Sequence, residues 1–239
     1  SAMDESSRAT GWFRGIPGTV WALGLVSLFM DISSEMIHSL LPVFLVTALG
    51  ASAMSVGLIE GVAEATALIA KTFSGVLSDW IGKRKTLTLL GYGLGALTKP
   101  FFALAASADM VFAARFADRI GKGIRTAPRD ALVADVTPPD VRGAAYGMRQ
   151  SLDNVGGFGG PLLAIALMAV FAGDFRRVFW IAVIPGFVSV AILAIWVREP
   201  AKSNANSSPK AIRLREIAAL GPAYWFVVAV GAVFTLARF

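Results

Sequence analysis

Long apolar runs follow one another along almost the whole chain, and short polar segments separate them. Each run has about 20 residues or more, which as a helix is long enough to cross the hydrocarbon of a membrane. A soluble core does not need so many long apolar runs, and the strands of membrane barrels are much shorter. The pattern therefore predicts an all-α, polytopic membrane helical bundle. Its predicted spans are residues 18–48, 51–78, 86–107, 109–129, 141–172, 178–197 and 217–239.

Polar segments divide the chain into four parts. Residues 1–16 are a polar N-terminal tail, and its first residues, Ser-Ala-Met, are typical of an expression-tag remnant. A six-helix domain is expected over residues 17–198, followed by a hydrophilic linker at 199–216 that is rich in Ser, Asn and Lys/Arg. The helix at 217–239 is interpreted as the first helix of a second, truncated domain.

The positive charges are distributed unevenly between the two ends of the predicted helices. Most Lys and Arg residues lie on the side of the N-terminus, whereas only Arg176 and Arg177 lie on the other side. By the positive-inside rule, the N-terminus and the 199–216 linker are cytoplasmic in a multi-pass protein of the cell inner (plasma) membrane. The net charge of +6 is therefore interpreted as a topology signal and not as a nucleic-acid footprint.

Several classes of chemistry lack the residues they need. The chain has no cysteine and one histidine, which leaves no disulfide framework and no thiolate nucleophile. Neither an HExxH zinc motif nor a Gly-x-Ser-x-Gly nucleophile motif occurs. We therefore predict that the protein is not an enzyme and holds no cofactor.

The segment GVLSDWIGKRK, residues 75–85, joins the second and third predicted helices. It combines a small residue for close helix approach, an acid at a helix end, a glycine for a tight turn and a basic run: Gly75, Asp79, Gly82, Lys83 and Arg84. This spacing resembles motif A of the major facilitator superfamily of secondary transporters, although Trp80 stands where that family prefers a basic residue. The resemblance implies a role in conformational switching, with Asp135 closing an ionic cluster.

A second resemblance lies in the fifth predicted helix, in the segment GMRQSLDNVGGFGGPLLA. Gly147, Gly156, Gly160 and Pro161 match most of motif C, the antiporter motif of the same superfamily, but Ala164 and the residue after it replace the final glycines. This resemblance implies an antiporter. Ordinary helix packing is the alternative, because two glycines four residues apart give a helix a smooth face.

The fourth predicted helix carries the basic segment ARFADRIGKGIRTAPRD. Arg115 is the preferred counterpart of the superfamily's motif B arginine, because it lies deeper in the helix than Arg119. An arginine that faces a cavity changes how strongly nearby carboxylic acids hold protons, which suits a proton relay. The other basic residues are expected to reach toward the cytoplasmic surface as snorkelling or topological charges: Arg119, Lys122, Arg125 and Arg129.

The first predicted helix contains the polar stretch MDISSEMIHSLLP. At 100° per residue, Asp31, Glu35 and His38 fall within an arc of about 60°, so this stripe should face a cavity and not lipid. The other candidate residues of the cavity are Glu60, Glu64, Arg115, Arg149 and Asp153. An isolated charge at the bilayer centre costs about 2.5–3.5 kcal/mol, so we expect these groups to pair, titrate or bind a ligand.

Three roles stay open for Asp31, Glu35 and His38. Membrane carboxylates of this kind load and release protons in pumps and transporters. Two carboxylates and an imidazole are also plausible ligands for a divalent transition metal. Finally, Asp31 or Glu35 pairs with Arg115, Lys71 or Arg149 and only holds helices together.

The resemblance implies the N-terminal half of a major facilitator transporter, built from inverted three-helix repeats, with the substrate between two halves. The function predicted from it is a proton-coupled exporter of small molecules that works by alternating access, with H⁺ as coupling ion. The alternatives are an exporter of divalent metal cations and, in another class, a non-transporting half-protein that acts as a receptor or assembly subunit. The expected partners are membrane lipid, a small-molecule or cation substrate and the missing C-terminal half.

Overall fold

The structure is a computed structural model that describes residues 15–198 and residue 230. The chain divides into two compact units, Ser1–Ala201 and Lys202–Phe239, and the fold and site below belong to the first. Three predicted segments lie outside the described residues: the tail 1–16 except residues 15 and 16, the linker 199–216, and the helix 217–239 except residue 230.

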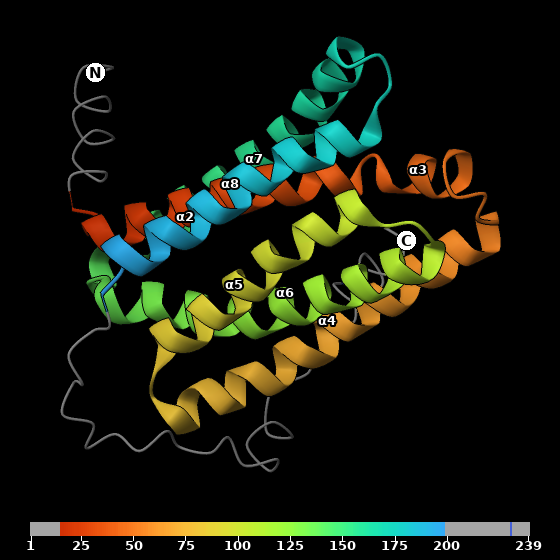
Figure 1. The fold of residues 1–239 in the computed structure, drawn as a ribbon. Coiled ribbons are helices and arrows are strands. Elements are labelled where there is room, and N and C mark those ends of the chain that lie inside the picture. Colours follow the sequence, from red (N-terminus) through yellow and green to blue (C-terminus); the bar gives the residue numbers. More distant parts are fainter. Residues whose placement is uncertain (1–14, 199–229, 231–239) are drawn as a thin grey trace. The chain divides into compact units, whose positions relative to one another are not determined.

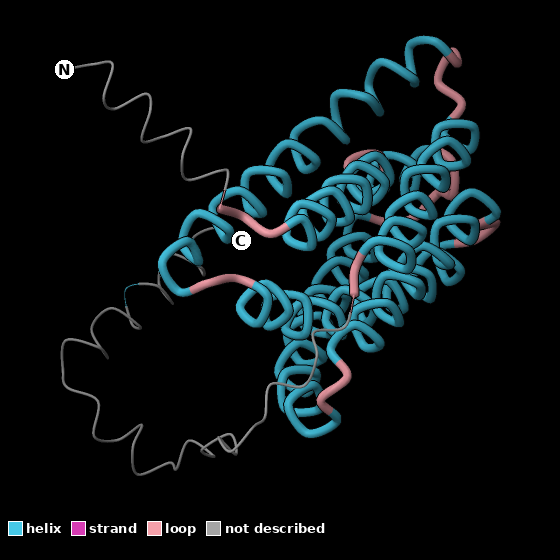
Figure 2. The backbone as a smooth tube through the Cα atoms, turned by 90° about the vertical axis from the view of Figure 1, so that its left-hand side faces the viewer, coloured by secondary structure: helices cyan, strands magenta, loops and turns pink. Residues whose placement is uncertain are grey.

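Residues 15–198 form helices joined by short connections (Figure 1), and no strand occurs in this range. The same chain seen from the side shows how short these loops are (Figure 2). The elements are α2 (Gly18–His38), α3 (Leu41–Thr47), α4 (Ala53–Ile81), α5 (Arg84–Leu104), α6 (Ala108–Val136), the 3-10 turn η1 (Pro139–Val141), α7 (Arg142–Val170) and α8 (Phe175–Trp196). The predicted helical membrane bundle is confirmed.

The ends of the helices follow from local sequence. Ser52, Ser107 and Asp174 precede α4, α6 and α8, and each side chain accepts a hydrogen bond from a backbone N–H of the first turn. Gly82 ends α4 in the left-handed conformation, with φ of 65°, which glycine adopts without strain. Helix α6 continues to Val136, beyond the predicted end at 129, because hydropathy marks the apolar part of a helix and not its full length.

The first predicted span, 18–48, is not one continuous helix. Pro42 has no N–H to donate to the carbonyl of His38, and α2 ends at that histidine. Ser39 and Leu40 close the break with bonds to Glu35 and Ile37. Helix α3 then continues as a separate short segment. His38 is thereby placed at the end of a helix and not in its middle.

Within residues 15–198, five helical segments are long and apolar enough to cross a membrane: Gly18–Thr47, Ala53–Ile81, Arg84–Leu104, Pro139–Val170 and Phe175–Trp196. Helix α6 has a similar length but carries many charged residues. It contacts α4 on one side and α5 on the other, so its charged face is covered by other helices of the bundle.

The helices form two layers (Figure 1). One layer contains α4, α6 and α5, and the other contains α7, α2 and α8, with α6 and α2 in the middle of their layers. The last three long helices repeat the contacts of the first three. If α2 is exchanged with α6, α4 with α7 and α5 with α8, the α2–α7 contact becomes the α6–α4 contact. In the same way, the α2–α8 contact becomes the α6–α5 contact. Successive helices reverse direction, so the arrangement is an inverted repeat.

Glycines bring the helix backbones within a layer close together. A Cβ atom on Gly156 would lie 2.7 Å from the carbonyl oxygen of Leu28, and one on Gly160 would lie 2.7 Å from Cβ of Glu35, both on α2. Gly91 and Gly121 meet in the same way between α5 and α6. These contacts are typical of membrane helices that pack through small residues.

Two glycines of the motif resemblances do not have this packing role. A Cβ on Gly147 would meet no atom within 4 Å, and one on Gly75 would meet Cβ of Ala127 at 3.5 Å, an ordinary contact distance. The expectation that Gly75 permits an unusually close helix approach is therefore wrong for this conformation. Of the motif C residues, Gly156 and Gly160 form the contact with α2, and Pro161 lies inside α7.

We expect Gly156→Ala to destabilise the α2–α7 contact in the full-length protein, because the new methyl group overlaps the backbone of α2. Overpacking of this kind costs about 1–3 kcal/mol, and should lower the melting temperature in detergent. The matched control is Gly157→Ala, one residue along the same helix, where a Cβ meets no atom within 4 Å. Equal melting temperatures for the two variants would contradict the packing described here.

Candidate functional site

Buried polar side chains gather where α2 faces α5 and α6, between the two layers of helices. We call this group the polar seam. Its members are Ser27, Ser34 and His38 of α2, Tyr92 and Lys99 of α5, and Asp118, Arg119 and Arg129 of α6. Because these groups are removed from water, each needs a partner, and the seam is where they find one.

Lys99 and Asp118 form an ion pair inside the bundle. Lys99 is fully buried, and its Nζ lies 2.8 Å from Oδ1 of Asp118. The same Nζ donates to the hydroxyl of Ser34 on α2 at 2.9 Å, and Thr98 lies 3.5 Å from Asp118. One ammonium group therefore joins α5, α6 and α2, and so connects both layers of the bundle.

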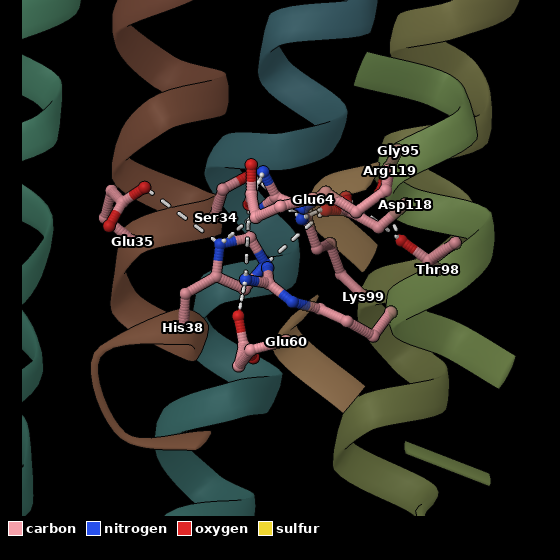
Figure 3. Close-up of polar contacts among 11 residues, drawn as sticks. Ser34, Glu35, His38, Glu60, Glu64, Gly95, Thr98, Lys99, Asp118 and Arg119 are labelled. Carbon is pink, nitrogen blue, oxygen red and sulfur yellow. Dashed lines mark hydrogen bonds and ion pairs between the residues drawn. The ribbon is translucent and has the colours of Figure 1, made fainter. Parts of the chain in front are cut away.

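His38 lies beside this pair (Figure 3). Its Nδ1 is 3.0 Å from the Nη2 nitrogen of Arg119, and its Nε2 is 3.4 Å from Oδ2 of Asp118, where it forms no hydrogen bond. The carboxylate of Glu35, one turn earlier on α2, is 4.0 Å from Nδ1. The imidazole thus lies between one arginine and two acids.

Two acids of α4 pair with arginines of α6. Arg115 contacts Glu60 at 2.5 Å and Glu64 at 4.0 Å, and Arg119 contacts Glu64 at 3.1 Å. The acid side chains are 33% and 38% exposed, whereas both arginines are almost fully buried. The carboxylates therefore lie at the edge of the site, and the guanidinium groups lie behind them.

The structure corrects the prediction for the other basic residues of α6. Arg119, Arg125 and Arg129 do not snorkel to a surface. Arg125 is buried over the ring of Tyr92, 4.5 Å from its centre, and Arg129 donates to the hydroxyl groups of Ser27 and Tyr92. These arginines lie inside the bundle because the adjacent helices supply aromatic and hydroxyl partners.

Asp31 differs from the other acids of the site. Among the described residues it forms no hydrogen bond or ion pair, although it is partly exposed. The negative charge of Asp153 repels the carboxylate of Asp31. Three cations of α6 attract it: Lys122, Arg125 and Arg129. Asp153 itself is bound by Arg149 at 2.6 Å. Among the described residues, the predicted pairing of Asp31 or Glu35 with Arg115, Lys71 or Arg149 therefore does not form.

The residues proposed as metal ligands do not converge. Within residues 15–198, no group of three or more His, Asp or Glu side chains is close enough to hold a metal ion. His38 points toward Arg119 and Asp118, whereas Asp31 lies near Asp153. The structure thus assembles no metal site from Asp31, Glu35 and His38.

The residues of the motif A resemblance lie at the connection between α4 and α5. Arg84 contacts Asp135 at 2.6 Å and Asp79 at 3.3 Å, so three elements of the chain meet in one ionic cluster. Lys83 precedes α5 as its N-cap residue and is exposed. We call the group of Asp79, Arg84 and Asp135 the Arg84 cluster.

Lys99 and Asp118 were missed in the sequence. Lys99 stands alone in the apolar run GALTKPFFAL, and Asp118 follows Arg115 by three residues on α6. The signal was present, because a lone charge in a membrane helix needs a partner wherever it occurs. Which partner it finds depends on how α5 and α6 pack, and sequence spacing does not determine that.

The sequence is similar to that of known membrane transporters. The family model described as Major Facilitator Superfamily matches residues 23–239. The chain is 30% identical to the uncharacterized MFS-type transporter MJ1317 of Methanocaldococcus jannaschii, over 95% of this chain and 55% of that protein. It is 24% identical to the quinolone resistance protein NorA of Staphylococcus aureus, over 71% and 42%. The chain spans about half the length of these relatives.

The fold is also similar to that of solved transporter structures. A bacterial homolog to the human lysosomal transporter Spinster, in an inward-facing and occupied conformation, matches with a TM-score of 0.63 and 24% sequence identity. The match covers 76% of this chain and 44% of that one. It supports the helical arrangement described above.

We expect Asp118→Asn to destabilise the full-length protein, because it leaves the ammonium of Lys99 buried without a counter-charge. Breaking a buried ion pair costs about 3–5 kcal/mol, so the melting temperature should fall. The double variant Lys99→Met/Asp118→Asn removes both charges and should recover part of the loss. Asp109→Asn, an exposed position on the same helix, is the control. The pairing would be contradicted by a double variant that is as unstable as the two single losses combined.

Proposed function

We propose that this chain, which belongs to the major facilitator superfamily, contains the N-terminal half of a multi-pass membrane transporter that exports small molecules in exchange for protons. The name of the relative NorA refers to quinolone resistance, and the glycines of the motif C resemblance pack α7 against α2. In this proposal the substrate binds between this half and a C-terminal half of the same protein.

The observation that carries the proposal is the state of Asp31. All the other acids on the facing sides of the helices except Glu35 have a lysine or arginine partner: Glu60, Glu64, Asp118, Asp130 and Asp153. An acid in an ion pair keeps its charge, whereas an unpaired acid in a low-dielectric environment readily binds a proton. Asp31 is thus our first candidate for the group that takes up and releases the coupling proton. Glu35, at 4.0 Å from His38, is the second.

The arginines of α6 support this assignment. Arg115 and Arg119 form ion pairs with Glu60 and Glu64, so these two acids already serve as counter-charges for α6. In the proposed mechanism Arg115 thereby confines protonation to Asp31. Binding of a proton would remove the negative charge from α2 and weaken its attraction to the cations of α6, which favours a change of conformation.

We assign the Arg84 cluster to the switching step. Its side chains are 24–54% exposed, and exposed ion pairs contribute about 0–1 kcal/mol each. An interaction of this size holds one conformation without preventing the other. The cluster ties the α4–α5 turn to the end of α6, which makes it suited to open and close once per transport cycle.

The proposed orientation places the N-terminus and the α4–α5 turn in the cytoplasm of a cell with this protein in its inner membrane. The basic residues at this end, Lys83, Arg84 and Lys85, support it, since positive loops remain inside. Protons would then enter from the other end, near the break between α2 and α3, and substrate would leave in that direction.

We expect Asp31→Asn to uncouple transport from the proton gradient. In proteoliposomes with the full-length protein, an imposed pH gradient should accelerate movement of a fluorescent quinolone, and the variant should lose this acceleration by roughly tenfold or more. Counterflow without a gradient should persist, because the substrate site remains. Asp174→Asn is the matched control, since asparagine also caps α8. Gradient-driven flux in Asp31→Asn equal to that of the wild type would rule out the assignment.

We expect Arg84→Ala to slow transport with little change in substrate affinity, because the Arg84 cluster acts on conformation and not on binding. The measurement is the maximal flux and the half-saturating concentration in the same proteoliposomes. Arg177→Ala removes a more exposed ion pair, at the start of α8, and should leave both values unchanged. A loss of affinity at constant maximal flux would place Arg84 in binding instead.

A further inference from the structure

His38 is the last residue of α2 and its imidazole crosses from one layer of helices to the other. The side chain is 7% exposed and reaches α6, where it contacts Arg119 and Asp118. The other side-chain hydrogen bonds from α2 to this layer involve the hydroxyl groups of Ser34 and Ser27. His38 is therefore the titratable member among the α2 side chains that bridge the seam.

The contact with Arg119 fixes the protonation state of the imidazole. A guanidinium group only donates hydrogen bonds, so Nδ1 of His38 must accept, at 3.0 Å. The ring is then neutral and carries its proton on Nε2, which faces Oδ2 of Asp118 at 3.4 Å. In this state the imidazole bonds across the seam, from α2 to α6.

A second proton on the ring removes that bond. Nδ1 becomes a donor and can no longer accept from Arg119, and two positive groups then face each other at 3.0 Å. Glu35 offers Nδ1 a new acceptor at 4.0 Å, on the same helix. Arg119 keeps a partner on its own side of the seam, because Glu64 lies 3.1 Å from its Nη1. Protonation therefore removes the bond from Arg119 between the layers and adds one bond, from His38 to Glu35, within α2. The pair of Arg119 with Glu64 is present in both states, and Asp118, which faces Nε2 at 3.4 Å, is already bound by Lys99.

All the helices around His38 contribute charges to this exchange. Helix α6 supplies Arg115, Arg119 and Asp118, α4 supplies Glu60 and Glu64, α5 supplies Lys99 through its bond to Asp118, and α2 supplies Glu35. Each of the basic groups already pairs with a carboxylate: Arg115 with Glu60, Arg119 with Glu64 and Lys99 with Asp118. The arginine is thus released without leaving a charge unpaired.

We propose that His38 is a proton-operated switch between the two layers of this six-helix domain. Neutral His38 holds the end of α2 to α6 through Arg119, and charged His38 turns to Glu35 and opens this end of the seam. The switch goes beyond the proton coupling proposed for Asp31 and does not require it, since it acts within one half of the transporter.

The test is a pH-dependent distance across the seam in the full-length protein. Spin labels on cysteines at Val46 of α3 and Met110 of α6 report on the two layers; both positions are exposed, and Phe44 packs α3 firmly against α8. Residues 1–239 contain no native cysteine. As the pH is lowered, we expect the distance distribution of the wild type to shift when the imidazole takes up its second proton. Labels at Met54 and Met110, within one layer, should show no shift.

Matched variants identify the titrating group. Glutamine accepts from Arg119 and donates toward Asp118 but cannot take up a proton, so His38→Gln should keep the high-pH distance at every pH. His38→Arg carries its charge at every pH and should keep the low-pH distance. Asp31→Asn should retain the shift while losing gradient-driven flux, which separates this proposal from the one for Asp31. A shift that persists in His38→Gln, or a wild type without one, would overturn the switch.

A measurement on the wild type does not depend on any variant folding. The ¹⁵N signals of the imidazole, identified by contact with the Phe102 ring, show which nitrogen carries the proton. We expect an unprotonated Nδ1 at high pH and a doubly protonated ring at low pH. A proton on Nδ1 at high pH would exclude the bond from Arg119 and with it the switch.

Discussion

The ion pair between Lys99 and Asp118 is the interaction on which the rest of this domain depends. A charged side chain inside an apolar bundle is stable only beside an opposite charge or a set of hydrogen-bond partners, because the surroundings cannot solvate it. Asp118 meets that need for Lys99, and the ammonium group then draws Ser34 of α2 into the same contact. The charged helix α6 can therefore occupy the centre of a membrane bundle, with α4 and α5 covering it and α2 opposite.

Contacts within a layer of helices and contacts between the two layers involve different kinds of residues. Within a layer, backbones meet at glycines such as Gly121 and Gly156, where a single added methyl group would collide with the neighbouring helix. Between the layers, α2 meets α5 and α6 through hydroxyl groups, an imidazole and charges as well as through buried apolar side chains, and α5 packs against α8. Close backbone packing resists deformation, whereas hydrogen bonds exchange partners at small cost. The layers are therefore suited to act as stiff units, and the polar seam is suited to change.

Much of this fold could be predicted from the sequence, because a membrane restricts its helices to long apolar runs. The order of the helices, the inverted repeat and the acids and bases near Arg84 followed from such patterns and from the superfamily resemblance. The break after His38 was also encoded, by Pro42, but it lay inside a run that hydropathy treats as continuous. The inverted repeat came from the superfamily resemblance alone, because such symmetry depends on which helices touch and not on which residues recur.

The pairing of charges was the part that the sequence did not reveal. A helical wheel assigned Asp31, Glu35 and His38 to one stripe, yet the structure leaves Asp31 unpaired among the described residues and turns His38 toward α6. Arg119 was expected near a surface and lies at the centre of the network instead. Periodicity gives the direction of a side chain around its own helix, but its partner depends on the neighbouring helix and on the depth at which the two cross.

The central claim is that paired acids keep their charge and that Asp31 is the acid left to titrate. Infrared difference spectroscopy of the full-length protein tests it directly, because a protonated carboxyl group has a C=O stretching band that a carboxylate lacks. On lowering the pH, the account predicts a carboxyl band that disappears in Asp31→Asn and is unchanged in Glu60→Gln and Glu64→Gln. A band that survives in Asp31→Asn and is lost when Glu60 or Glu64 is replaced would contradict it.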